Sequence, residues 1–128
     1  MAEPIRITIP GRPVPKERPA VTGRYVRVYT PPRTRAYQEQ VAAAALEQGC
    51  KPLTGPVSMR LVFYLCDDRQ GDLSNMIKSV EDGLNGIAYD DDAQVKHIVA
   101  YVRRAKRRRD ERAEVEIAPL SNEEVETA

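Results

Sequence analysis

The sequence predicts an α+β domain in which two helices pack on a small mixed sheet of four or five strands. Several segments alternate apolar and polar residues as strands do, and two others repeat apolar residues at helical spacing. The length of 128 residues fits one domain, residues 1–128. With 41% hydrophobic and 30% charged residues, we expect a packed core beneath a heavily charged surface.

The first predicted strand is Ile5–Ile9, where isoleucines alternate with polar residues until Pro10. Residues 10–32 then hold six of the ten prolines together with several arginines, which indicates an extended basic arm. Within this arm, Tyr25–Tyr29 is predicted to form a short strand.

The first predicted helix is Arg35–Gln48, with Thr34 as its N-cap and Gly49 just beyond its C-terminus. Its inward face is expected to consist of Tyr37, Val41, Ala44, Ala45 and Gln48. A second main strand follows at Val57–Leu65, where apolar residues alternate regularly.

The second predicted helix begins after Asp72 and stops at Asn85-Gly86. Its apolar face is expected to consist of Leu73, Ile77, Val80 and Leu84. The last two predicted strands, Val95–Val102 and Ala113–Ile117, would pair as a hairpin through an arginine-rich turn. Residues 119–128 are expected to form a frayed acidic tail.

The net charge of +1 conceals blocks of opposite sign. Residues 71–95 hold six acids and one lysine, whereas residues 103–109 hold six cations and no acid. Basic blocks that flank an acidic block would suit a protein that binds a polyanion and brings it to a cation held by carboxylates. The alternative is an ordinary surface on which the opposite charges form salt bridges. A single histidine and two cysteines exclude a His/Cys zinc enzyme and a disulfide scaffold. We expect reduced thiols, a cytoplasmic protein and no membrane span.

A carboxylate constellation lies between Asp72 and Asp92. Mg²⁺ is typically bound by one or two carboxylates with waters and phosphate oxygens, and Asp72 with Asp92 or Asp91 would supply that set. A cation there could polarise a phosphoryl oxygen and deprotonate a water. Spacing alone favours the alternative that Asp72 only caps its helix and that Asp90–Asp92 is a solvated turn. Because neighbouring side chains diverge, we do not expect all three aspartates to point into one site.

Helix geometry indicates which neighbours share this site. Ser74 and Lys78 are four residues apart and lie on one face, so Lys78 could neutralise charge on a phosphate. Asp82 lies about 15 Å along the helix from Asp72, too far to bind the same ion. We therefore expect Asp82 to have a structural role, such as an ion pair with Lys78.

Three motifs stand between Gly71 and Val95. They read Asp72-Leu73-Ser74-Asn75-Met76-Ile77-Lys78, Asp82-Gly83-Leu84-Asn85-Gly86 and Asp91-Asp92-Ala93-Gln94-Val95. Together they resemble the signature of the RusA-family Holliday junction resolvases, as does the proline-rich segment Pro13–Pro19. The resemblance covers most of the chain. It implies a small dimeric endonuclease that needs Mg²⁺, for which Mn²⁺ could substitute.

The resemblance implies that Asp72 and Asp92 bind the metal and that Lys78 is the catalytic lysine. The predicted catalytic set is Asp72, Lys78 and Asp92. The predicted metal ligands are Asp72, Asp91 and Asp92, with Ser74 and Asn75 in supporting positions. The family has a second acid where Ser74 stands, and a neutral hydroxyl is a weaker ligand for a hard cation. Ser74 could act through a water, Asp91 could replace the charge, or the protein could bind junctions and cut them poorly.

Two basic segments are the predicted DNA-contacting surfaces, and acids on the returning strand could neutralise part of the second one, the arginine-rich turn. The predicted DNA contacts are Arg12, Lys16 and Arg18 in the arm and Arg103, Arg104, Lys106, Arg107, Arg108 and Arg109 in the turn. The resemblance implies a four-way DNA junction as substrate and a homodimer, since two symmetric cuts need two sites.

Three functions remain compatible with the sequence. The first is a bacterial or phage-encoded endonuclease that resolves branched DNA during recombination and repair. The second is a catalytically weak junction-binding protein of the same fold. The third is a structural protein whose charged blocks are ordinary surface.

Overall fold

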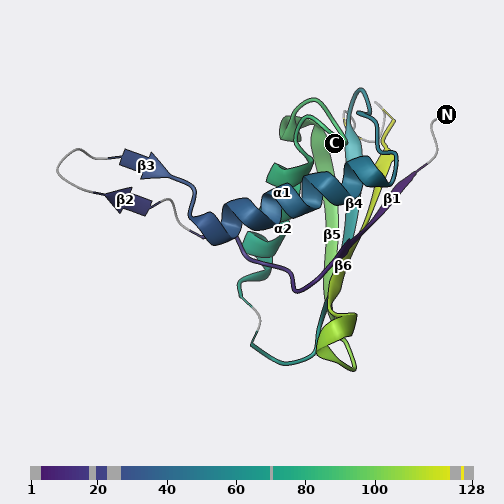
Figure 1. Ribbon diagram of the computed structural model, residues 1–128. Helices are drawn as coiled ribbons and strands as arrows, with labels where there is room; N and C mark the ends of the chain where they lie inside the picture. Colours follow the sequence, from purple (N-terminus) through teal and green to yellow (C-terminus); the bar gives the residue numbers. More distant parts are fainter. Residues whose placement is uncertain (1–3, 18–19, 23–26, 70, 122–124, 126–128) are drawn as a thin grey trace.

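The computed structural model describes residues 4–17, 20–22, 27–69, 71–121 and 125. Four strands form a mixed sheet in the order β1-β6-β4-β5. They are β1 (Ile5–Pro10), β4 (Val57–Leu65), β5 (Val95–Arg104) and β6 (Arg112–Pro119). The helices α1 (Pro32–Glu47) and α2 (Leu73–Leu84) pack on one face of this sheet (Figure 1). The predicted α+β class is therefore confirmed.

A separate two-stranded sheet belongs to the arm. Its strands β2 (Ala20–Thr22) and β3 (Arg27–Tyr29) lie beyond the N-terminal end of α1, away from the four-stranded sheet (Figure 1). The predicted short strand is confirmed for its last three residues, while Tyr25 and Val26 lie outside the described residues.

The predicted hairpin of the last two strands is wrong, because β4 lies between them. β5 pairs in parallel with β4, where Ala100 faces Leu61, and β6 pairs antiparallel with the other edge, where Val115 faces Leu61. Residues 105–111 cross the end of β4, and the Ala105 N–H donates to the Leu65 carbonyl at 2.9 Å. The crossing spans two strand spacings, about 10 Å, which a seven-residue segment covers easily.

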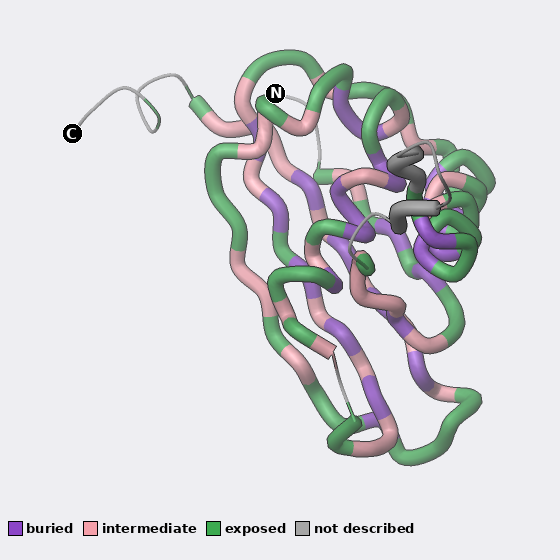
Figure 2. The backbone as a smooth tube through the Cα atoms, turned by 90° about the vertical axis from the view of Figure 1, so that its left-hand side faces the viewer, coloured by how far each residue is buried: buried purple, intermediate pink, exposed green. Residues whose placement is uncertain are grey.

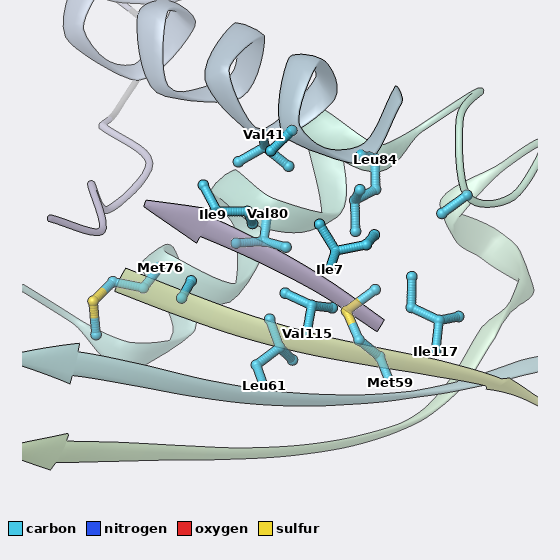
Figure 3. Packing of buried hydrophobic residues seen from close by; sticks show 14 of the residues in the cluster. Ile7, Ile9, Val41, Met59, Leu61, Met76, Val80, Leu84, Val115 and Ile117 are labelled. Carbon is cyan, nitrogen blue, oxygen red and sulfur yellow. The ribbon is translucent and has the colours of Figure 1, made fainter. Parts of the chain in front are cut away.

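The core lies between the helices and the sheet (Figure 3). In β4 every second residue from Val57 to Leu65 is buried, and Figure 2 shows the same alternation along the sheet. The predicted inward residues of α1 are buried except Gln48, which is exposed. Its side-chain amide instead pairs with the Thr8 N–H and carbonyl at 2.9 and 2.8 Å and so anchors α1 to β1. In α2, Val80 and Leu84 are buried as predicted.

α1 begins at Pro32, earlier than predicted, because proline suits the first helical position and needs no N–H partner. Thr34 is therefore not the N-cap. Its buried hydroxyl accepts the Glu17 N–H at 3.1 Å and ties the arm to the helix. Gly49 has the positive φ of +79° expected just beyond a helix.

The C-terminal segment stays attached to the fold at Pro119 and Leu120, where the sequence predicts that a frayed tail has already begun. Pro119 belongs to β6, and the Leu120 N–H donates to the Pro56 carbonyl at 2.8 Å. Residues 122–124 and 126–128 of that tail lie outside the described residues. Both cysteines are free thiols. In the described part of the chain, no helix has the length and hydropathy to cross a membrane.

Candidate active site

The first turn of α2 holds three of the predicted site residues. Asp72 is the N-cap, and its carboxylate accepts the Ser74 N–H at 2.9 Å. Ser74 and Asn75 are exposed, and the Asn75 carbonyl accepts the Lys16 N–H at 2.8 Å. Asp72 therefore has the capping role that spacing alone favoured, and its exposed carboxylate can still meet a ligand.

One face of α2 carries Ser74, Lys78 and Glu81, which are spaced by four and three residues. Lys78 is exposed, whereas Glu81 is only 9% exposed. Burial raises the pKa of Glu81, and Lys78 opposes that shift. The carboxylates of Asp92 and Asp82 raise the pKa of Glu81 further.

Asp92 begins a short 3-10 helix, η1 (Asp92–Gln94), directly before β5. Asp91 caps this turn by accepting the Ala93 N–H at 2.9 Å, and the Gln94 side chain accepts the Asp91 N–H at 3.0 Å. The Gln94 amide also donates to the Leu53 carbonyl at 2.9 Å, so the whole turn is fixed to the fold.

The neighbours of Asp91 in this turn favour the charged form of its carboxyl group. The Ala93 N–H lowers the pKa of Asp91, and a hydrogen bond with the Asp92 carboxyl lowers it further. Two adjacent carboxyl groups repel each other when both are ionised, so a cation beside them would relieve that repulsion.

The charge of Asp92 acts on Glu81, near the C-terminal end of α2. The buried Tyr89 hydroxyl donates to the Glu81 carbonyl at 2.7 Å, and the charges of Glu81 and Asp92 both raise the pKa of Tyr89 beyond the effect of burial. Glu81 lies nine residues after Asp72, about 13 Å along the helix axis. Within the described chain, no group of three or more histidine, cysteine, aspartate or glutamate side chains could hold a metal ion. A cation here would therefore need water and phosphate oxygens as further ligands.

The arm runs along α2 and is fastened to it by Lys16. The Lys16 ammonium lies 2.6 Å from the Asp82 carboxylate, so the structural role of Asp82 is confirmed but its partner is Lys16, not Lys78. Pro15 packs closely against Gly71, where any side chain would collide with its ring. Arg18, another predicted DNA contact, lies outside the described residues.

Arg12 lies in a network at the opposite end of α2 from Tyr89. Its guanidinium is 2.6 Å from the Glu111 carboxylate, 2.9 Å from Asp67 and 2.6 Å from the Arg69 carbonyl. The Glu111 side chain is 2% exposed and also accepts the Cys66 N–H at 3.1 Å. These contacts occupy the guanidinium, which indicates that Arg12 joins the arm to β4 and β6. Its contact with DNA stays a prediction.

The cationic run, residues 103–109, lies at the end of β5 and in the crossing to β6, which includes η2 (Arg108–Asp110). Arg104 pairs with Asp68, and Arg107 lies 3.3 Å from Asp110. Arg103 lies over the Tyr101 ring, 5.7 Å from its centroid. Among the described residues, no ion pair is found for four cations of the run, Arg103, Lys106, Arg108 and Arg109. All six side chains are exposed, so the run stays the predicted phosphate-contacting surface.

Comparisons with known proteins show which family this chain resembles. The family model for the endodeoxyribonuclease RusA matches residues 10–118, a range that includes every predicted site residue. The chain is also similar to the uncharacterised protein YqaN of Bacillus subtilis (strain 168), with 28% identity over 115 residues that cover 71% of this chain and 81% of that protein. The family match confirms the resemblance seen in the three motifs. The chain belongs to the RusA family of endodeoxyribonucleases, hydrolases that cleave phosphodiester bonds in DNA.

Proposed function

We propose that this protein is a Mg²⁺-dependent endonuclease that resolves four-way junctions and other branched DNA during recombination and repair. The family match over residues 10–118 carries this proposal. The exposed Lys78 on α2 and Asp92 at the start of η1 support it, because a cation site and a phosphate-neutralising ammonium belong together in such a reaction. The enzyme would work in the cytoplasm of a bacterium, encoded by the host or by a phage.

The metal ligands in this proposal are Asp92, Asp91 and, by family position, Asp72. The neighbouring carboxyl groups of Asp91, which caps η1, and Asp92, its first residue, fit a hard divalent cation, which prefers oxygen ligands. Such a cation, Mg²⁺ or Mn²⁺, would polarise a phosphoryl oxygen and lower the pKa of a water molecule. The capping box of η1 keeps Asp92 in place, so little ordering is needed when the ion and substrate bind.

Lys78 is proposed to neutralise the negative charge that builds up on the attacked phosphate. In the hydrolysis, the oxygen of water bonds to phosphorus while one P–O bond of the strand breaks, and a proton from water passes to the leaving oxygen. A homodimer with two-fold symmetry would present one such site to each of two equivalent strands. Exposed cations of the run 103–109 would hold the phosphate backbone nearby.

The second candidate is a junction-binding protein that cuts poorly. The observation that favours it is Ser74, since its neutral hydroxyl stands where the family has an acid. Such a protein would retain the cationic surface and the shape of the fold but would bind the cation weakly.

Replacing Asp92 with asparagine separates these functions. We expect the wild-type protein to cut a four-way junction when Mg²⁺ is added, and Asp92→Asn to cut about 100-fold more slowly or less while it still binds at low salt. Asp90→Asn is the matched control, because Asp90 is exposed two residues away and should cut normally. Tight junction binding without any cleavage by the wild-type protein would contradict the nuclease and support the second candidate. Asp72→Asn, assayed in parallel, tests the family position.

A further inference from the structure

A pocket lined by arginines lies where the arm, the start of α1 and the segment before α2 meet. Its volume is about 240 Å³, and its charged lining residues are Arg12, Arg33 and Arg69. Among the described residues around it, none is acidic. Pockets for drug-sized ligands have volumes of roughly 300 Å³ or more, so this one suits a smaller anionic group. We call it the arginine pocket.

Two of these three arginines have unused hydrogen-bond donors. Arg12 is held by the Glu111 and Asp67 carboxylates at 2.6 and 2.9 Å. Arg33, in the first turn of α1, and Arg69 are both exposed, and among the described residues no ion pair is found for either guanidinium. The Arg69 backbone is nevertheless fixed, because its carbonyl accepts from Arg12 at 2.6 Å and its N–H donates to Asp67 at 2.9 Å. The pocket therefore offers two free guanidiniums and no competing acid.

The arginine pocket lies beside the first turn of α2. Gly71, one of its lining residues, directly precedes the N-cap Asp72 and packs against the ring of Pro15, which also lines it. The Lys16 N–H donates to the Asn75 carbonyl at 2.8 Å, so the arm is fastened to this turn of the helix. The walls of the pocket are thus held together by packing and hydrogen bonds before any ligand binds.

A second pocket connects the arginine pocket with the cationic run. Its volume is about 490 Å³, and Arg12 and Arg69 line both pockets. Arg108, an exposed cation of the run, lines the second pocket. The two acids that line it are the carboxylates that Arg12 already binds. Exposed cations therefore follow one another from the run, past Arg69, to Arg33 at the start of α1.

We propose that the arginine pocket binds a phosphodiester group of the DNA substrate, with Arg33 and Arg69 as the anion-binding side chains. A guanidinium presents paired N–H donors that match two phosphate oxygens. The pocket would lead the DNA backbone from the cationic run to Asp72, and the contact would carry no sequence information. This inference rests on the proposed nuclease function, but it concerns how the substrate is held and not which residues bind the ion.

The first test compares two variants that lose the same charge, with EDTA present so that no metal-dependent cutting occurs. Arg33→Ala with Arg69→Ala removes both proposed contacts. Arg35→Ala with Lys51→Ala is the matched control, because these cations are exposed and neither lines the pocket. The affinity for a labelled four-way junction is measured by fluorescence anisotropy at several salt concentrations.

Loss of two phosphate contacts should make the slope of log affinity against log salt shallower by about 1.8. A fourfold rise in salt would then weaken binding by the pocket variant about 12-fold less than binding by the wild-type protein. The control variant should keep a slope close to that of the wild-type protein. A slope that neither variant changes, or that both change equally, would overturn the inference.

A second test uses the unmodified protein, so that it stands even if the pocket variant fails to fold. Nuclear magnetic resonance follows the arginine Nε–H signals while a short DNA duplex is added. We expect the signals of Arg33 and Arg69 to shift and that of Arg35 to stay. DNA binding that leaves both pocket signals unchanged would overturn the inference. A wild-type protein that binds junctions through this pocket but never cuts them would support the inference and count against the proposed nuclease.

Discussion

The cationic run should make junction binding steeply salt-dependent. Ion pairs in the structure limit the number of its cations that are available to contact phosphates. Six cations lie in residues 103–109, but Arg104 pairs with Asp68 and Arg107 with Asp110. Each phosphate contact contributes about −0.9 to the slope of log affinity against log salt. Four available cations therefore give a slope of about −3.6 from this run. A fourfold rise in salt would then weaken binding about 150-fold.

The perturbation is the triple variant Lys106→Ala, Arg108→Ala and Arg109→Ala, which removes exposed cations and no described ion pair. We expect the slope to become shallower by about 2.7, three times the contribution of one contact. Fluorescence anisotropy of a labelled four-way junction at several salt concentrations measures it. Arg104→Ala with Arg107→Ala is the control, because these two cations are already paired and should change the slope less. An unchanged slope in the triple variant would refute a phosphate-contacting role for this run.

Two further predictions concern stability. Arg12→Ala leaves Glu111 buried without its cation, and we expect it to lower the unfolding free energy by about 2–3 kcal/mol in chemical denaturation. Burial alone would raise the pKa of Glu111, but hydrogen bonds from Cys66 and Arg12 outweigh it and hold the pKa below the ordinary 4.5. The wild-type protein should therefore lose stability as the pH falls below about 4.5, and the variant should lose less over that range. Gly83→Ala should cost about 1–3 kcal/mol, because its Cβ would lie 2.8 Å from the Val41 Cβ, and an unchanged melting temperature would contradict this.

Local patterns predicted the elements of the fold because each element is set by nearby residues. The alternation in Val57–Leu65 identified β4 with its observed bounds, and Asp72 with Asn85-Gly86 bracketed α2. The strand order could not be read in the same way. Both edges of β4 accept a partner, and β6 occupies the edge between β1 and β4 while β5 occupies the other. That choice is made by the packing of the whole core.

Local patterns also predicted only part of the candidate site, because some of its contacts form only in the folded chain. Motif spacing picked out Asp92 and Lys78, which the structure places at the start of η1 and on the exposed face of α2. Motif spacing could not show that Glu81 is buried, since burial depends on how α2 packs in the folded chain. Nor could it show that the cations Lys16 and Arg12 are engaged by acids distant in the sequence, 66 and 99 residues away. Such pairings arise only when the chain is folded.

The topology separates the two charged surfaces of one subunit by the full length of β5. Asp92 begins η1 just before the strand, and the cationic run begins at its last residues. A ten-residue strand spans about 33 Å, the length of roughly ten base pairs of duplex. A DNA arm cut at Asp92 and held by the run of the same subunit must therefore lie along the edge strand β5. If an arm is held closer to the cut than that, its cations must come from the other subunit of the proposed dimer. In the first arrangement, the ten-residue length of β5 would set the distance between the bound phosphates and the proposed metal site.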